Sequence, residues 1–226
     1  MRLGTYYRSR VMQYMGIVPR GGYVLDVGSF DGYYLSLFPH GVRIGVDLHV
    51  SPAARIPMVC ADACALPFPD EVFDTIYAFD VIEHVRNKTA FIDSLLRVLK
   101  PGGLLVLSTP HKGMRLFPAS LTARTHWQWG HREPGYDGYG PEEIAALLPP
   151  GVKVTFRFWP APCLLKTYFL LRFCWRKVSP VLAKPLVFLV AWCDKRWKDR
   201  RLANTFMLVA HIEKQGSSPI NREGNV

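Results

Sequence analysis

The sequence predicts an α/β fold with a doubly wound parallel sheet, and three observations indicate it. Residues Tyr23 to Gly32 form an apolar run that breaks into a glycine turn and restarts as a helix. Asp47 closes a second short apolar run, so a carboxylate is expected at the tip of the neighbouring strand. Further apolar runs follow at Ile56 to Cys60 and Phe73 to Phe79, in the succession typical of an open α/β sheet.

The glycine turn indicates the kind of ligand that such a sheet would bind. A dinucleotide site needs the spacing G-x-G-x-x-G, whereas this turn runs Asp26, Gly28, Phe30 and Gly32, each separated by one residue. An acidic residue at the start of the turn would repel a phosphate. It suits a cation instead, such as the sulfonium and ammonium groups of S-adenosylmethionine. Asp47 could then accept hydrogen bonds from both ribose hydroxyls.

Three later segments follow the turn at regular spacing: Ala61 to Asp70, Phe73 to Val85 and Lys100 to His111. With these segments the chain resembles the class I S-adenosylmethionine-dependent methyltransferases, particularly the branch that modifies small molecules and quinone-like or lipid-linked substrates. The resemblance extends from Tyr23 to Ser108 and more weakly to Leu148. It implies a Rossmann-like sheet of seven strands in the order 3-2-1-4-5-7-6, whose last strand is antiparallel.

The resemblance also implies a set of cofactor-binding residues. Asp47 would hold the ribose, and Asp62 would accept a hydrogen bond from the exocyclic amine of adenine. Phe30 departs from the family, which has a small residue there, and its ring could crowd the methionine tail. Asp74 and the segment Lys100 to Gly103 are interpreted as structural, the latter as a helix stop and turn before a strand. The full predicted set comprises Asp26, Gly28, Ser29, Phe30, Gly32, Asp47, Leu48, Asp62, Ala63 and Phe79.

Histidines are the candidate catalytic bases, because an acidic acceptor hydroxyl needs a base that titrates near neutral pH. His111 is favoured, since it follows the fifth strand and would face the acceptor. His84 follows the fourth strand, where it could equally cap the next helix. His131 and His126 lie in a region rich in aromatic residues, 111–140, that we expect to form an acceptor-pocket loop, although both could be ordinary loop histidines.

Length and composition favour one domain over residues 1–226, with a flexible tail at 215–226. Only Leu48 to Arg55 separate Asp47 from the third strand, which is too short for a full crossover helix. The five cysteines show neither zinc-ligand nor disulfide spacing, so no metal site is predicted and the thiols are expected to be reduced and buried. The first residues lack the features of a secretory signal, and a cytoplasmic location is predicted.

The positive net charge is confined to one segment. Residues 151–201 contain 12 Lys or Arg against two Asp, whereas the other 16 basic residues are balanced by 16 acidic ones. The same segment is rich in aromatic and aliphatic residues, and it predicts two amphipathic helices, Cys163 to Val178 and about Val181 to Trp197. This insertion, 161–201, is predicted between strands 6 and 7. It could lie on an anionic membrane surface, cover the sheet or form a homodimer, while nucleic-acid binding is disfavoured.

The expected function is methyl transfer from S-adenosylmethionine to the oxygen or carbon of a small, apolar or lipid-linked acceptor, leaving S-adenosylhomocysteine. Methylation of nucleobase amines is disfavoured, because Asp80 to Glu83 stands where such enzymes have an Asn/Asp-Pro-Pro-Tyr sequence. Two rival functions stay open. One is an RNA or protein methyltransferase that uses the basic helices, and the other is a non-catalytic module that binds the cofactor or docks on membranes.

Overall fold

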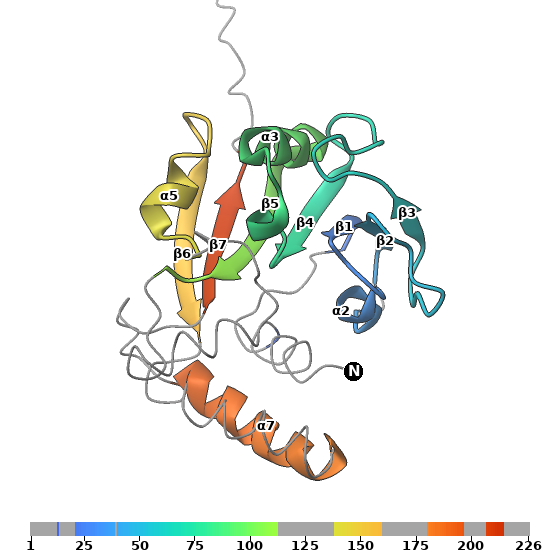
Figure 1. Cartoon of the computed structure of the whole chain (residues 1–226), viewed down its shortest axis with the longest axis vertical. Helices are drawn as coiled ribbons and strands as arrows, with labels where there is room; N and C mark the ends of the chain where they lie inside the picture. The colour runs from blue at the N-terminus through green and yellow to red at the C-terminus, as the bar shows by residue number, and fades with distance from the viewer. Residues whose placement is uncertain are drawn as a thin grey trace, which may run out of the picture.

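The structure of this chain is a computed structural model, which describes Gln13 and residues 21–38, 40–112, 138–159, 180–196 and 207–214. Its framework is a seven-stranded sheet in the order β3-β2-β1-β4-β5-β7-β6, as predicted (Figure 1). The strands are β1 (Tyr23–Val27), β2 (Val42–Asp47), β3 (Met58–Cys60), β4 (Phe73–Phe79), β5 (Leu99–Pro110), β6 (Lys153–Trp159) and β7 (Met207–Glu213).

The described helices are mostly short and connect these strands. The insertion predicted between the sixth and seventh strands is present, and its described part is α7, which begins one residue before the predicted start and ends one before the predicted end. The predicted helix at Cys163 to Val178 lies outside the described residues. The helices are α2 (Tyr33–Ser36), the 3₁₀-helix η1 (Ile82–His84), α3 (Lys88–Val98), α5 (Pro141–Ala145) and α7 (Pro180–Arg196).

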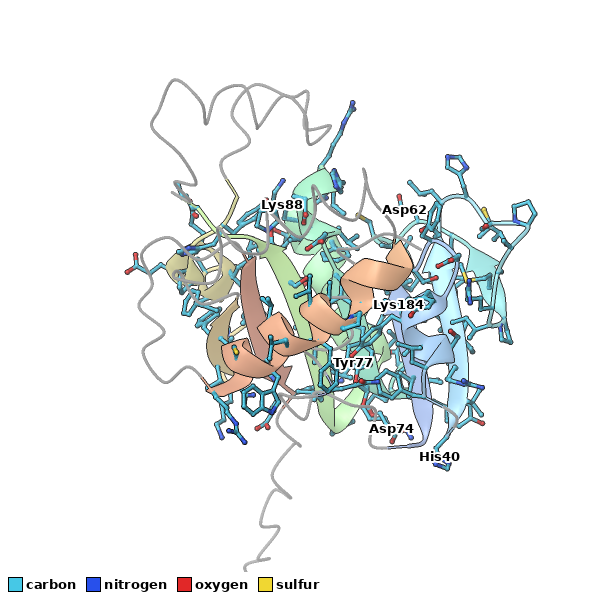
Figure 2. The ribbon with its side chains drawn as sticks, turned by 90° about the horizontal axis from the view of Figure 1, so that it is seen from below. His40, Asp62, Asp74, Tyr77, Lys88 and Lys184 are labelled. Atoms are coloured by element: carbon cyan, nitrogen blue, oxygen red, sulfur yellow. The ribbon has the colours of Figure 1, made fainter. Side chains whose placement is uncertain are left out.

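Strand direction divides the sheet into two parts. Strands β3, β2, β1, β4 and β5 are parallel to their neighbours, whereas β7 pairs antiparallel with both β5 and β6. Residues that follow the parallel strands, such as Asp62 and Lys88, lie at one edge of the sheet, and Asp74 lies at the other (Figure 2). We call the first the carboxyl edge and the second the amino edge. The carboxyl edge is where open α/β sheets bind their ligands.

The larger core lies between the sheet and the helices α3 and α5. Alternate residues of β5 and β7 point into it, because successive side chains of a strand face opposite sides. Helix α7 lies on the opposite side of the sheet from α3 in both views (Figures 1 and 2). The core side chains include Phe91, Ile92 and Leu95 of α3, Ile144 of α5, and Leu105, Leu107, Ala210 and Ile212 of the strands.

Asp74 has the structural role that the sequence predicts. Its carboxylate accepts hydrogen bonds from the Tyr23 amide at 2.8 Å and from Lys100 Nζ at 2.8 Å, which ties the start of β1 to β4 and β5. Burial alone would raise the pKa of this carboxyl, but the hydrogen bonds from Lys100 and Tyr23 outweigh burial and lower it. Leu66 is buried in the core and Phe68 packs against it.

The connection from β2 to β3 is short, as expected, and contains only turns and bends between Leu48 and Pro57. The prediction for Lys100 to Gly103 is partly wrong, because α3 ends at Val98 and β5 begins at once with Leu99. The reason is long-range pairing: the Gly102 amide donates to the Lys214 carbonyl at 2.7 Å. These residues are therefore drawn into the strand instead of forming a free turn.

The prediction of buried cysteines is also wrong for the thiols that the structure describes. Cys60 is exposed at the end of β3, which is an edge strand of the sheet, while Cys64 and Cys193 are partly buried. All three are free thiols. Burial, followed by the nearby charge of Asp62, raises the pKa of the Cys64 thiol, so this side chain stays protonated at neutral pH.

Candidate active site

The glycine turn lies at the carboxyl edge, between β1 and α2. The amides of Gly28 and Ser29 both donate to the Val46 carbonyl, at 2.8 and 3.2 Å, which holds the turn against the end of β2. Gly28 has a φ of 70°, and a Cβ added there would lie 2.4 Å from Cγ2 of Val81. Only glycine fits this position, because both the backbone conformation and the available space exclude a side chain.

Asp47 lies at the tip of β2 and joins the turn by a side-chain hydrogen bond. Its Oδ2 accepts from the Phe30 amide at 3.0 Å, and its Oδ1 accepts from the His49 amide at 3.3 Å. A carboxylate has about four lone-pair positions, so further donors can be accommodated at both oxygens. A pair of ribose hydroxyls matches this remaining acceptor capacity.

Phe30 adopts an unusual conformation in the turn. Its φ is 56°, a left-handed value that is uncommon for a bulky residue, and its side chain is 60% exposed. Leu48, directly after Asp47, is 63% exposed. Two exposed apolar side chains therefore flank the Asp47 carboxylate, where they could cover an apolar part of a ligand. Such strained residues concentrate at functional sites.

Asp26 and Phe79 lie deeper, on the central strands. Asp26 is only 4% exposed and is level with Gly45 of β2 and Tyr77 of β4 in the sheet register. The Phe79 ring makes edge contacts with Tyr34, at a centroid distance of 4.9 Å, and Phe79 is 9% exposed. The structure thus places a buried carboxylate and an aromatic wall beside the point where the strand order reverses, between β1 and β4.

The predicted adenine segment follows β3 next to Asp47. The Ala61 amide donates to the Asp47 carbonyl at 3.1 Å, so Asp62 lies one residue beyond a direct contact with β2. Asp62 Oδ1 accepts from the Cys64 amide at 2.9 Å, and the Asp62 carbonyl accepts from the Ala65 amide at 3.0 Å. The hydrogen bonds from the Cys64 and Ala65 amides form a local turn, which fixes the direction of the exposed Asp62 carboxylate. Ala63, within this turn, is partly buried.

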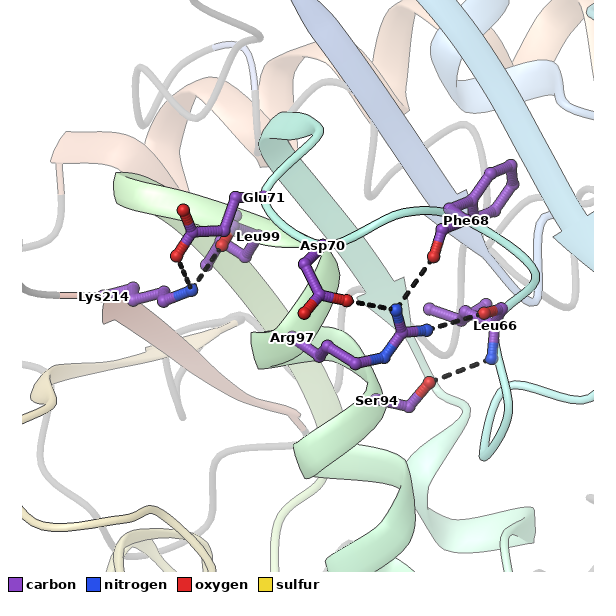
Figure 3. A network of polar contacts seen from close by, with 8 residues as sticks. All are labelled: Leu66, Phe68, Asp70, Glu71, Ser94, Arg97, Leu99 and Lys214. Atoms are coloured by element: carbon purple, nitrogen blue, oxygen red, sulfur yellow. Dashed lines mark hydrogen bonds and ion pairs between the residues drawn. The ribbon is translucent and has the colours of Figure 1, made fainter.

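A cluster of polar contacts holds the rest of that segment on α3 (Figure 3). Arg97 donates to the carbonyls of Phe68 and Leu66 at 2.8 and 2.7 Å, and to Asp70 at 2.7 Å. Ser94 Oγ accepts from the Leu66 amide at 3.0 Å. The segment from Asp62 to Asp70 is therefore a supported loop, since side chains of α3 bond to two of its carbonyls, one of its amides and the Asp70 carboxylate.

His111 lies at the far side of the carboxyl edge, beyond the end of β5. It forms an isolated parallel bridge with Tyr139, and its ring lies 5.2 Å from that of Phe158. In the strand order, β1 and β4 separate β2 from β5, so Asp47 and His111 are about 15 Å apart across the edge. The structure thus separates a candidate cofactor end from a candidate acceptor end.

Next to His111, the end of β5 is closed by residues 138–140. The Tyr139 amide donates to the Pro110 carbonyl at 3.0 Å, and Lys112 bonds to Glu143 in the first turn of α5. The Lys112 ammonium, and then the Gly140 amide, lower the pKa of the Glu143 carboxyl. His84 is exposed in η1, where its amide donates to the Val81 carbonyl. His126 and His131 lie outside the described residues, as does most of 111–140.

Sequence reasoning missed one residue as a site candidate, Asp80, which comes directly after β4. Its φ is 57°, and its Oδ1 accepts from Ser108 Oγ at 3.1 Å while its amide donates to the Ser108 carbonyl at 2.9 Å. A carboxylate directly after a buried parallel strand is the signal that could have indicated it. Asp80 lies between the Asp47 end and the His111 end of the edge.

No three His, Cys, Asp or Glu side chains in the part of the chain that the structure describes are grouped so that they could hold a metal ion. Among the described helices, none has both the length and the apolar character needed to cross a bilayer.

A family model described as a methyltransferase domain matches residues 2–148. An uncharacterised methyltransferase of Mycobacterium leprae is 41% identical over 104 residues, which make up 41% of this chain and 39% of that protein. A probable S-adenosylmethionine-dependent methyltransferase of Mycolicibacterium smegmatis is 30% identical over 118 residues, covering 47% of this chain and 46% of that protein. The chain therefore spans less than half the length of these relatives.

Solved structures show the same fold. Phosphoethanolamine N-methyltransferase 2 of Haemonchus contortus, in complex with S-adenosyl-L-methionine, aligns with a TM-score of 0.62 and 16% identity over 95% of this chain and 57% of that one. A possible histamine N-methyltransferase of Thermotoga maritima aligns with a TM-score of 0.59 and 15% identity, over 94% and 91% of the two chains. The predicted resemblance is confirmed: this chain belongs to the methyltransferase domain family and has the class I methyltransferase fold.

Proposed function

We propose that this chain transfers a methyl group from S-adenosylmethionine to an oxygen or carbon atom of a small acceptor that is apolar or lipid-linked. The observation that carries the proposal is the arrangement of Asp47, Phe30 and Gly28 at the carboxyl edge, because it combines a fixed ribose acceptor with a turn that admits close backbone approach. The family match and the named S-adenosylmethionine-dependent relative support the same cofactor.

We propose a role for the predicted cofactor-binding residues from where they lie. Asp47 would bind the ribose hydroxyls, and Asp62 the exocyclic amine of adenine. The exposed side chains of Phe30 and Leu48 would cover the adenosine, since the Phe30 side chain is 60% exposed instead of filling the turn. Asp26 would attract the cationic methionine end. Gly32, Ser29, Ala63 and Phe79 would shape the walls around these contacts.

Methyl transfer requires only that the acceptor atom be held in line with the sulfonium methyl group and be deprotonated where its pKa is high. When bound, the cofactor supplies an electrophilic methyl group whose bond to sulfur breaks as the bond to the acceptor forms. We propose that His111 removes the acceptor proton, with His84 and His131 as alternatives. Asp80, held by Ser108, is placed to orient the acceptor between the two ends of the edge.

The acceptor is proposed to be apolar because of the side chain that packs on His111 and because of the composition of the segment that follows β6. His111 packs on Phe158, and the segment that follows β6 carries both the apolar residues and the excess charge. A peripheral position at a membrane fits such an acceptor. An RNA methyltransferase would instead be expected to expose mainly basic side chains there, whereas the exposed side chains of α7 include Leu186, Leu189 and Trp192.

The test has two stages. Calorimetric titration with S-adenosylmethionine and with S-adenosylhomocysteine should show binding of both, and binding of neither would refute the proposal. Methyl transfer from radiolabelled cofactor is then measured into a lipid extract, total RNA and a protein mixture. Label in the organic phase is expected. Label confined to RNA or protein would support that rival, and cofactor binding without any transfer would support the non-catalytic module.

A further inference from the structure

Helix α7 carries a stripe of exposed apolar side chains. Leu186 is 50% exposed, Leu189 52% and Trp192 37%, whereas Val187 and Val190 are buried. At about 100° per residue, the exposed side chains share one face and the two valines lie on the other. Burial of Val187 and Val190 fixes the rotation of the helix. The apolar stripe is therefore directed away from the protein, where it contacts solvent at a cost in free energy.

Exposed basic side chains lie near both ends of α7, and the one at the C-terminal end shares the side of the helix that carries this stripe. Lys184 and Arg196 are exposed, and the Arg196 guanidinium lies 3.9 Å from the centroid of the Trp192 ring. The only acidic residue within α7 is Asp194, and the surrounding segment 151–201 contains 12 basic residues against two acidic ones. A Trp and basic residues beside exposed leucines are the composition of helices that lie in the headgroup region of an anionic bilayer.

The position of α7 connects this face to the site. Trp159 at the end of β6 is level with Met207 at the start of β7, and Met207 is level with Pro110, the residue before His111. The chain therefore leaves and re-enters the sheet at the acceptor end of the carboxyl edge. A surface that binds α7 would therefore bind a part of the chain whose two ends both connect to the acceptor end.

We propose that the face of α7 formed by Leu186, Leu189 and Trp192, with Arg196 at its C-terminal end, docks the protein on an anionic lipid bilayer. The helix lies parallel to the surface, with its leucines at the boundary between headgroups and acyl chains. Charge decides between this partner and a second copy of the chain. Two copies would bring two strongly positive segments together, whereas anionic headgroups complement them. The inference deepens the proposed function, because it names where a lipid-linked acceptor would be met.

The experiment is flotation of the whole chain with vesicles of phosphatidylcholine and phosphatidylglycerol, compared with vesicles of phosphatidylcholine alone. The chain should float with the anionic vesicles and much less with the neutral ones, and added salt should weaken the binding. The double variant Leu186→Glu, Leu189→Glu should lower the partition coefficient about tenfold or more, because it removes apolar contact and adds repulsion. Glutamate preserves helix propensity, and both side chains are half exposed, so folding should be retained.

Two matched variants control for other effects. Val42→Glu places one such negative charge on a side chain that is 48% exposed at the start of β2, at the amino edge, and it should float like the unmodified chain. The double variant Leu186→Met, Leu189→Met keeps the apolar stripe and should also float. Equal flotation of the glutamate double variant and the unmodified chain would overturn the proposal. So would a dimer, seen by sedimentation, that the glutamate variant dissociates while vesicles bind neither protein.

Cofactor titration on the same samples separates this proposal from the proposed function. The glutamate double variant should bind S-adenosylhomocysteine as the unmodified chain does, since α7 supplies none of the cofactor contacts proposed. Flotation without cofactor binding would leave the docking face intact and refute the methyltransferase proposal. Cofactor binding without flotation would refute the docking proposal and leave the methyltransferase proposal intact.

Discussion

The two parts of the sheet are stabilised by different kinds of contact. In the parallel part, the glycine turn and the tip of β2 are joined by hydrogen bonds between residues less than 20 positions apart, such as that from the Phe30 amide to Asp47. In the antiparallel part, Lys214 Nζ bonds to Glu71 across 143 residues, and β7 is inserted between β5 and β6. The cofactor end is therefore built from nearly local sequence, while the antiparallel part depends on contacts between segments that are far apart in the sequence.

The largest expected effect is on the free energy of unfolding, and it is measured by substituting one glycine in each part of the sheet. Gly28→Ala and Gly102→Ala both place a side chain at a positive φ, 70° and 75°, but only the first meets a neighbour, Val81, whereas nothing lies within 4 Å at Gly102. We expect Gly102→Ala to lower the free energy of unfolding by about 1 kcal/mol and Gly28→Ala by about 3 kcal/mol, because overlap adds to backbone strain. Urea denaturation measures both. Equal losses would contradict the tight contact at the turn.

The next effect tests the cofactor end directly. Asp47→Ala should weaken binding of S-adenosylhomocysteine by about 1.5–3 kcal/mol, because charge-assisted hydrogen bonds to the ribose are lost. Asp47→Asn keeps one acceptor for the Phe30 amide and should give a smaller loss. Isothermal titration calorimetry measures the affinities. An unchanged affinity in the alanine variant would show that the ribose binds elsewhere.

A third prediction concerns the antiparallel part, where His211 on β7 has a buried Nε2 atom with no hydrogen-bond partner among the residues that the structure describes. Burial, and then the charge of Arg157, lower its pKa from 6.5 to about 4, partly opposed by Glu213. The unfolded chain takes up this proton near pH 6.5 and the folded chain only near pH 4. Stability is therefore fully present above about pH 6.5 and falls as the pH decreases towards 4, by about 1–3 kcal/mol.

The variant His211→Phe removes this titration and should flatten the dependence of the unfolding free energy on pH between 6.5 and 4. Below that range the carboxyl groups with lowered pKa values, Asp74 and Glu143, destabilise both proteins alike. Chemical denaturation at a series of pH values provides the measurement. If the unmodified chain and the variant show the same slope between pH 6.5 and 4, His211 is not buried in its neutral form.

The smallest effect concerns Phe30. Phe30→Gly relieves the left-handed strain but adds freedom to the unfolded chain, so the unfolding free energy should change by less than about 1 kcal/mol. Cofactor affinity should decrease slightly, since the exposed side chain would no longer cover the adenosine. A clear gain in affinity would instead mean that the ring obstructs the site. Denaturation and calorimetry on the same preparation distinguish these outcomes.

Much of the cofactor end could be predicted from the sequence because its signals are local. Gly28 and Gly32 both have positive φ values, as expected of a tight turn after a strand, and Asp47 ends β2 beside that turn. The left-handed backbone of Phe30 could not be predicted, since the residue itself opposes it. The turn adopts it because the Asp47 carboxylate and the Val46 carbonyl bind successive amides.

The antiparallel part and the insertion depended more on tertiary structure. The position of the insertion and the boundaries of α7 followed from its pattern, but which side of α7 is exposed did not, because burial of Val187 and Val190 depends on what packs against them. The strand at Lys100 to Gly103 forms only when Lys214, more than 100 residues later, pairs with it. The sequence by itself thus determined the fold class, the glycine turn and its neighbouring carboxylate, since each depends on residues close together in the chain. The extent of β5, the strained position of Asp80 and the outward apolar face of α7 were decided by the tertiary structure, because distant segments supply the hydrogen bonds and the buried surface that fix them.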